Sequence, residues 1–289
     1  MELFQYPYMQ RALIGALVIG LAAPALGIYL VQRRLALIGD GVGHVALTGV
    51  GAGLLLNQSP VLVAVIVATL GAITIELVRA RGRTSGDLAL ALLFYGGIAG
   101  GVMLVGLSDN TRALNAYLFG SLTTISPADL TTITVLGAAI LVTMLALRPA
   151  LFAVCHDEEY ARVSGLPVRT LNLLLAVATA VTVTIAMRAV GVLLISALMV
   201  VPVAAAQQVT RGFRGTLAAA MALGLFAAGS GVYVAANADT APGASVVLMA
   251  IASFAVVALG GAVWRALRRR ATPVAETATE PHEVVLHRS

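Results

Sequence analysis

Apolar runs of about 20 residues recur along the whole chain, and they limit its fold more than any other feature. A helix of about 20 residues spans roughly 30 Å of hydrocarbon. Hydrophobic residues make up 60% of the 289 positions and charged residues 11%, which excludes an ordinary soluble domain. Because the runs are continuous rather than alternating, helices are favoured over a membrane β-barrel. The expected fold class is all-α, a polytopic transmembrane helical bundle.

We interpret the runs as about nine spans that form one transmembrane domain over residues 1–264. The segment 265–289 is basic and then polar, and we expect a disordered cytoplasmic tail there. The weakest division is between the sixth and seventh spans, where only Arg188 interrupts two apolar runs. The expected spans are 12–32, 35–56, 60–78, 88–107, 130–147, 170–187, 190–209, 215–236 and 243–264.

The basic residues are 18 arginines, and the chain has no lysine. The phosphate-binding loop Gly-x-x-x-x-Gly-Lys-Ser/Thr needs a lysine, so another chain must handle any ATP. With the N-terminus outside, fifteen arginines fall in cytoplasmic segments, and only Arg11, Arg112 and Arg188 fall outside. The arginines sit at the ends of apolar runs rather than on a basic face with aromatic platforms, so nucleic acid is excluded as a partner despite the net charge of +5.

Three polar residues of the second span, Asp40, His44 and Thr48, are spaced at i, i+4 and i+8 and share one helix face. An unpaired carboxylate in lipid costs about 2.5 to 3.5 kcal/mol, so this face should line the bundle interior or a watery path. A carboxylate and an imidazole one turn apart form half of a site for a divalent first-row cation. A buried Asp–His hydrogen bond that holds helices together is the structural alternative, and the pair alone leaves both open.

Other polar and small residues carry weaker indications. Glycines surround the Asp40–His44 pair, which favours close helix packing and also leaves room for an ion. Glu76, three residues before Arg79, suggests an ion pair at the inner interface. Ser196 and Pro202 could mark a kink along a pathway, although serine often bonds its own helix backbone.

Two connections are longer than simple turns. The outer segment 109–129 contains Leu114, Tyr117, Leu118 and Phe119, an amphipathic stretch expected at the membrane interface and able to meet an external partner. In the inner segment 148–169, acidic residues at 157–159 precede Gly165. This pattern predicts a short cytoplasmic helix with an acidic first turn and a glycine stop, available for docking.

Several segments, taken in order, resemble the permeases of ABC importers for zinc, manganese and iron. Residues 35–50 contain Gly-Asp-x-x-x-His-x-x-Leu-x-Gly-Val, and residues 85–94 resemble Ser-x-Asp-x-x-x-Gly-x-x-Phe with Ala91 at the glycine position. Residues 115–120, 187–202 and 241–244 are also similar to segments of that family. The chain departs from the family at Gly43, where serine is usual, and at Thr48, where proline is frequent.

The resemblance implies a type II ABC importer-like permease in the bacterial cytoplasmic membrane. Such a chain is not itself an enzyme, has no permanently bound cofactor, and moves a divalent metal as substrate, zinc first and then manganese or iron. Asp40 and His44 carry over as metal-pathway residues. Residues 159–165 resemble the family's Glu-Ala-Ala-x-x-x-Gly loop, so Glu159, Ala161 and Gly165 carry over as the ATPase-coupling helix.

The implied partners are a cytoplasmic ABC ATPase, an extracytoplasmic metal-binding protein, and a second permease that is an identical copy or a close homologue. Two rival functions stay open. One is a proton-coupled secondary metal transporter in which Asp40 and His44 relay protons, and the other is an ABC permease for a metal chelate such as a siderophore. The absence of His-Glu-x-x-His argues against an intramembrane metalloprotease.

Overall fold

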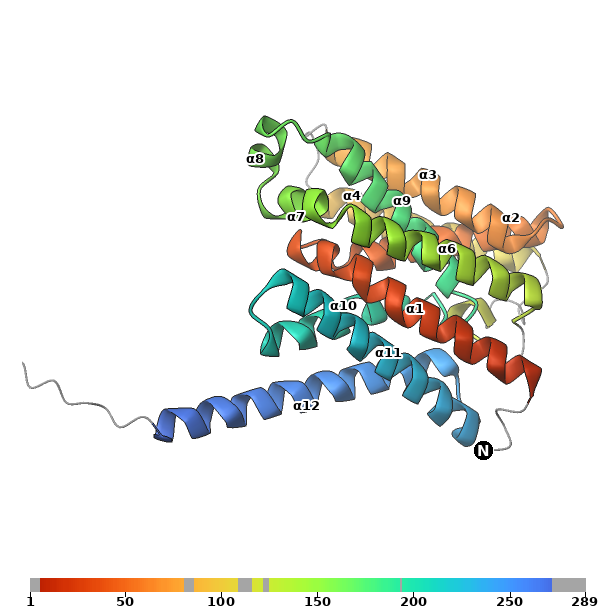
Figure 1. The fold of residues 1–289 in the computed structure, drawn as a ribbon. Coiled ribbons are helices and arrows are strands. Elements are labelled where there is room, and N and C mark those ends of the chain that lie inside the picture. The colour runs from red at the N-terminus through yellow and green to blue at the C-terminus, as the bar shows by residue number, and fades with distance from the viewer. Residues whose placement is uncertain (1–5, 81–85, 109–115, 122–124, 193, 272–289) are drawn as a thin grey trace, which may run out of the picture.

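The computed structural model describes residues 6–80, 86–108, 116–121, 125–192 and 194–271, and within these residues every regular element is a helix (Figure 1). The expected all-α class is therefore confirmed. The helices are α1 Pro7–Gln32, α2 Ile38–Leu55, α3 Pro60–Ala80, α4 Gly86–Leu107, α6 Pro127–Ala146, α7 Arg148–His156, α8 Glu158–Val163, α9 Val168–Ala186, α10 Ile195–Val209, α11 Phe213–Ala238 and α12 Pro242–Ala271.

Eight helices are long and apolar enough to cross a membrane, and α10 is a shorter apolar helix of 15 residues. The prediction that the seventh span runs from 190 is wrong at its start, because α10 begins only at Ile195. Gly191 takes φ +87°, a left-handed conformation that a continuous helix cannot contain. Hydropathy alone did not reveal this break, since the residues on both sides of it are apolar.

The two ends of the bundle differ in what they carry (Figure 1). The short helices α7 and α8 lie at the same end as the C-terminal end of α12, and the start of α1 lies at the opposite end. At 1.5 Å per residue, the 30 residues of α12 extend about 45 Å, which exceeds the hydrocarbon thickness. α12 passes the expected domain boundary at 264 and runs to Ala271, and the remaining tail, 272–289, lies outside the described residues.

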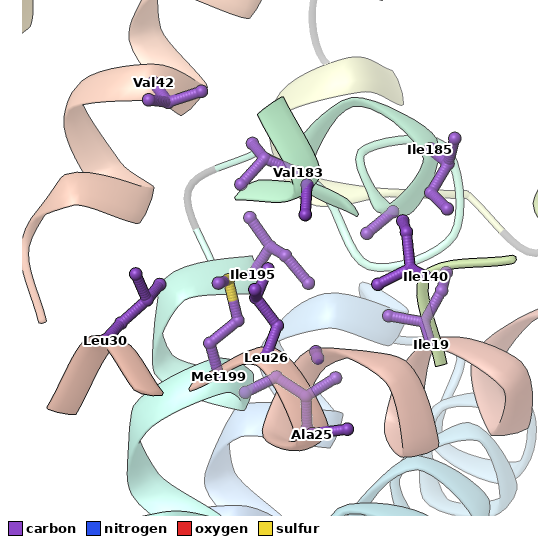
Figure 2. Close-up of a cluster of buried hydrophobic side chains, with 14 of the residues drawn as sticks. Ile19, Ala25, Leu26, Leu30, Val42, Ile140, Val183, Ile185, Ile195 and Met199 are labelled. Carbon is purple, nitrogen blue, oxygen red and sulfur yellow. The ribbon is translucent and has the colours of Figure 1, made fainter. Parts of the chain in front are cut away.

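α1 occupies the centre of the bundle. It lies between a group formed by α2, α3, α4 and α9 and a group formed by α10, α11 and α12 (Figure 1). Most of its length is buried, including the fully buried side chains of Ile19, Leu26 and Tyr29. Figure 2 shows Ile195 and Met199 of α10 beside Leu26 of α1 in this apolar core. α1 therefore contacts both groups, through α9 of the first and through α10 and α11 of the second.

Candidate functional site

α2 presents its polar residues on one half-buried face, as their spacing predicted. Asp40, His44 and Thr48 are each partly exposed, whereas Val42 and Ala46 between them are fully buried. The small residues of α2 let its other sides pack closely against α3, α9 and part of α4. The polar face is thus positioned by the burial of the rest of the helix.

Asp40 lies in the first turn of α2 and accepts a hydrogen bond from the hydroxyl of Ser196, in the first turn of α10. Val209, the last residue of α10, follows Ser196 by 13 positions, which is about 20 Å of helix. The pair therefore lies within the helical bundle, far from the C-terminal end of α10. Sequence reasoning assigned Ser196 to a kink or to its own backbone, because its partner is 156 residues away in the chain.

His44 lies one turn further along α2, against α4. Its ring meets that of Phe94 edge-on, with centroids 4.5 Å apart and an interplanar angle of 77°. The imidazole Nδ1 is buried and has no hydrogen-bond partner among the described residues. No hydrogen bond joins Asp40 and His44 within the same part of the chain, so the structure does not show the structural alternative of a direct Asp–His bond.

α4 approaches the polar face closely. A Cβ added at Gly97 would lie 2.6 Å from the carbonyl carbon of His44, so only glycine fits between the two helices. The Thr48 hydroxyl donates a hydrogen bond of 2.8 Å to the Gly97 carbonyl oxygen. Thr48 thus links α2 to α4 by a hydrogen bond that uses its hydroxyl proton.

An open cavity of about 250 Å³ lies between α2 and α4 beside Asp40. Part of its wall comes from residues 85–94, the second segment on which the family resemblance rests. Within the described residues, no group of three or more His, Cys, Asp or Glu side chains could hold a metal ion. Asp40 and His44 therefore offer two donors, an incomplete coordination set. The cavity is lined by Leu37, Asp40, Leu90, Ala91, Phe94 and Tyr95.

The segment between α9 and α10 is held by residues 116–121. The Val192 N–H donates to the Tyr117 carbonyl oxygen at 2.9 Å, and Arg188 forms an ion pair of 2.6 Å with Asp129. The Tyr117 side chain is 5% exposed and accepts a hydrogen bond from Arg188. Tyr117 is therefore buried against the α9–α10 connection, whereas Phe119 of the same stretch is 43% exposed. Leu114 lies outside the described residues.

The inner connection contains the expected short helix, α8. The Asp157 side chain caps it by accepting from the Tyr160 N–H, and Gly165 ends it with φ +79°. The Leu166 N–H donates to the Ala161 carbonyl oxygen and the Gly165 N–H to that of Arg162, the two bonds of a Schellman motif. The predicted acidic first turn and glycine stop are confirmed.

The coupling residues differ in their exposure. Glu159 and Gly165 are exposed at this end of the bundle, and Ala161 is fully buried.

The predicted Glu76–Arg79 ion pair is also present, with a separation of 3.1 Å between carboxylate and guanidinium.

Comparison with known proteins agrees with this arrangement. The model of the ABC 3 transport family matches residues 5–260. The manganese transport system membrane protein MntC of Halalkalibacterium halodurans is 31% identical, over 88% of this chain and 88% of its own length. The chelated iron transport system membrane protein YfeD of Yersinia pestis is 32% identical, over 89% of this chain and 86% of its own length.

A zinc relative and a solved structure match over similar lengths. The high-affinity zinc uptake system membrane protein ZnuB of Haemophilus influenzae is 31% identical, over 82% of this chain and 91% of its own length. PsaBC from Streptococcus pneumoniae, solved in complex with Fab, superposes with a TM-score of 0.80 at 28% identity, covering 88% of this chain and 92% of that chain.

Proposed function

Because the chain belongs to the ABC 3 transport family and is the membrane permease of a metal ABC transporter, we propose that it carries a divalent first-row metal ion into the cytoplasm. Asp40 and His44 act as transient ligands of that ion. The observation that carries the proposal is the half-buried polar face of α2, where a carboxylate fixed by Ser196 lies one turn from an imidazole whose Nδ1 has no partner among the described residues.

An incomplete ligand set suits transport. An ion held by a saturated site would leave slowly, whereas conduction requires binding that is weak enough to release. Two donors from α2 can replace part of the ion's water shell while water or other groups supply the rest. The cavity beside Asp40 gives the ion space to approach from the α2–α4 side.

Zinc is our first candidate for the substrate, followed by manganese and iron. The relatives named for manganese, iron and zinc are 31%, 32% and 31% identical to this chain, so identity does not rank the metals. The ligand chemistry favours zinc, because a given nitrogen and oxygen site binds it more tightly than manganese or iron in the Irving–Williams order.

Three further proteins complete the proposed transporter. A cytoplasmic ABC ATPase docks on α8, whose residues Glu159 and Gly165 are exposed at the arginine-rich end of the bundle. An extracytoplasmic metal-binding protein delivers the ion, and a second copy of the chain or a close homologue forms the other half of the pathway. ATP-driven closure of the ATPases moves the α8 helices, and the exposure of the α2 site alternates between the two faces.

The test is uptake into proteoliposomes that contain the permease with its ATPase and its binding protein. We expect ATP-dependent, saturable uptake of zinc, and no uptake when a proton gradient is present without ATP. Uptake driven by the proton gradient alone would contradict the proposal and favour a secondary transporter. ATP-driven uptake of a ferric siderophore without uptake of any free ion would contradict it in favour of a chelate permease.

A further inference from the structure

Arg33, at the C-terminal end of α1, joins α1 to α8 and α9, at partners 125 and 139 residues away in the chain. Its guanidinium donates a hydrogen bond of 2.7 Å to the Asn172 side-chain oxygen in α9. It also forms an ion pair of 3.3 Å with the Glu158 carboxylate in α8. The Arg33 side chain is only 9% exposed, and Asn172 is buried. A planar guanidinium can hold both partners at once in fixed directions.

Glu158 has room on both sides. A cavity of about 620 Å³ and another of about 460 Å³ flank it, and both are lined by Glu158 and Arg79. Glu158 also pairs with Arg162 at 3.2 Å, but that pair is exposed and stays within α8. Among the ion pairs of the described residues, only Arg33–Glu158 joins α8 to one of the long helices of the bundle. The two cavities leave space beside this ion pair.

α1 passes close to α10 a short distance from Arg33. Gly27 lies six residues earlier, about 9 Å along the helix. A Cβ on Gly27 would collide with the backbone carbonyl of Met199, so the two backbones touch with no side chain between them. Figure 2 shows Met199 beside Leu26 of α1. A displacement of α1 here moves α10 directly, because packed interiors transmit strain with little compression.

α10 then leads to the ion site. Met199 follows Ser196 by three residues, so both lie on nearly the same face of α10. Ser196 in turn holds the carboxylate of Asp40. A continuous series of polar and backbone contacts thus runs from α8 through α1 and α10 to α2.

We propose that the Arg33–Glu158 pair is the link by which movement of α8 reaches the metal site. This inference rests on the proposed function, since it assigns a route for the coupling that the ATPase would drive. Arg33 and Glu158 are positioning residues that never touch the ion. The competing view is a static ion pair that only stabilises the fold, and it predicts loss of folded complex without a change in transport per ATP.

The experiment measures zinc transported per ATP hydrolysed in proteoliposomes that contain the whole complex. Arg33→Met, Glu158→Gln and the double variant are compared with Glu76→Gln. The last variant is a matched control, because it also removes a carboxylate that lines the larger cavity, but from a pair confined to α3. The amount of ATPase that copurifies with each variant is measured in parallel.

We expect each single variant to lower the zinc-to-ATP ratio by five-fold or more, on the order of a typical coupling free energy, with the ATPase still bound. The double variant should fall no further than the lower of the two single variants, because both changes break one link. The Glu76→Gln ratio should equal that of the wild type. If Arg33→Met fails to fold, Glu158→Gln decides alone, since the Glu158 side chain is 43% exposed.

A wild-type ratio in Glu158→Gln, or an equal loss in Glu76→Gln, would overturn the inference. So would loss of bound ATPase in step with loss of transport, which would make the pair part of the docking surface. These outcomes differ from failure of the proposed function, in which the wild-type complex itself shows no ATP-dependent zinc, manganese or iron uptake.

Discussion

The Ser196 hydroxyl donates a hydrogen bond to the Asp40 carboxylate, and each residue lies in the first turn of its own apolar helix. The hydrogen bond partly satisfies a carboxylate that would otherwise be costly in hydrocarbon. It also fixes one carboxylate oxygen, and within the described residues the structure shows no hydrogen bond to the other, which can face an ion beside α2. Ser196 therefore orients a proposed ligand without being one.

Replacing Ser196 with alanine should raise the half-saturating zinc concentration by roughly ten-fold, because a hydrogen bond to a charged group contributes about 1.5 to 3 kcal/mol. Ser253→Ala is the matched control. Both serines are 8% exposed, but the Ser253 hydroxyl donates to the Ala250 carbonyl oxygen of its own helix. Equal uptake curves for the two variants would show that Ser196 has no special role.

Gly97 should be intolerant of any side chain. Gly97→Ala would force α4 away from the His44 backbone and should destabilise the protein by about 1 to 3 kcal/mol. Gly106→Ala, also in α4, has no atom within 4 Å of the added Cβ and should stabilise the helix by up to about 1 kcal/mol. Thermal unfolding in detergent compares the two, and a lower melting temperature for Gly106→Ala would contradict the packing described here.

Gly165 should tolerate asparagine better than valine. Its φ of +79° lies in the left-handed region, which asparagine accepts and β-branched residues avoid. No atom lies within 4 Å of an added Cβ, so backbone strain rather than collision decides the outcome. Gly165→Val should weaken ATPase docking or coupling while the permease still inserts. Normal transport by Gly165→Val would count against α8 as the coupling helix.

The orientation of the chain is open to direct labelling. With Cys155 replaced by serine, a cysteine at Glu2 should react with an impermeant reagent from outside, and a cysteine at Thr277 should react only from the cytoplasmic side. The arginine distribution is the reason for this expectation. Labelling of both positions from the same side would rule out an odd number of crossings.

Local sequence signals predicted the helices more reliably than the contacts between them. Long apolar runs revealed most spans, and the acidic residues with Gly165 revealed α8, because these signals lie within one segment. The predicted start of α10 was wrong. The turn before α10, which contains Arg188 and Gly191, is hydrogen-bonded to residues 116–121, a segment far away in the chain.

The polar contacts of the candidate site were also hard to predict, because they join different helices. Asp40 and His44 were proposed as ligands from their spacing on α2. Their neighbours Ser196 and Phe94 come from other helices, and their roles could not be read from position alone. The contacts of Arg33 were also not predicted. The sequence used this residue only to orient the chain in the membrane, because its partners lie 125 and 139 residues away.

The central claim is that Asp40 and His44 bind the passing ion, and zinc uptake per folded complex tests it most directly. Uptake is measured for the wild type, His44→Ala and Asp40→Asn in proteoliposomes, and is divided by the amount of correctly assembled complex. Asparagine keeps the size of Asp40 and removes its charge, which separates attraction of a dication from helix packing. We predict that both variants assemble normally and lose nearly all specific uptake. Wild-type specific uptake in both variants, with any loss confined to the yield of complex, would contradict the claim.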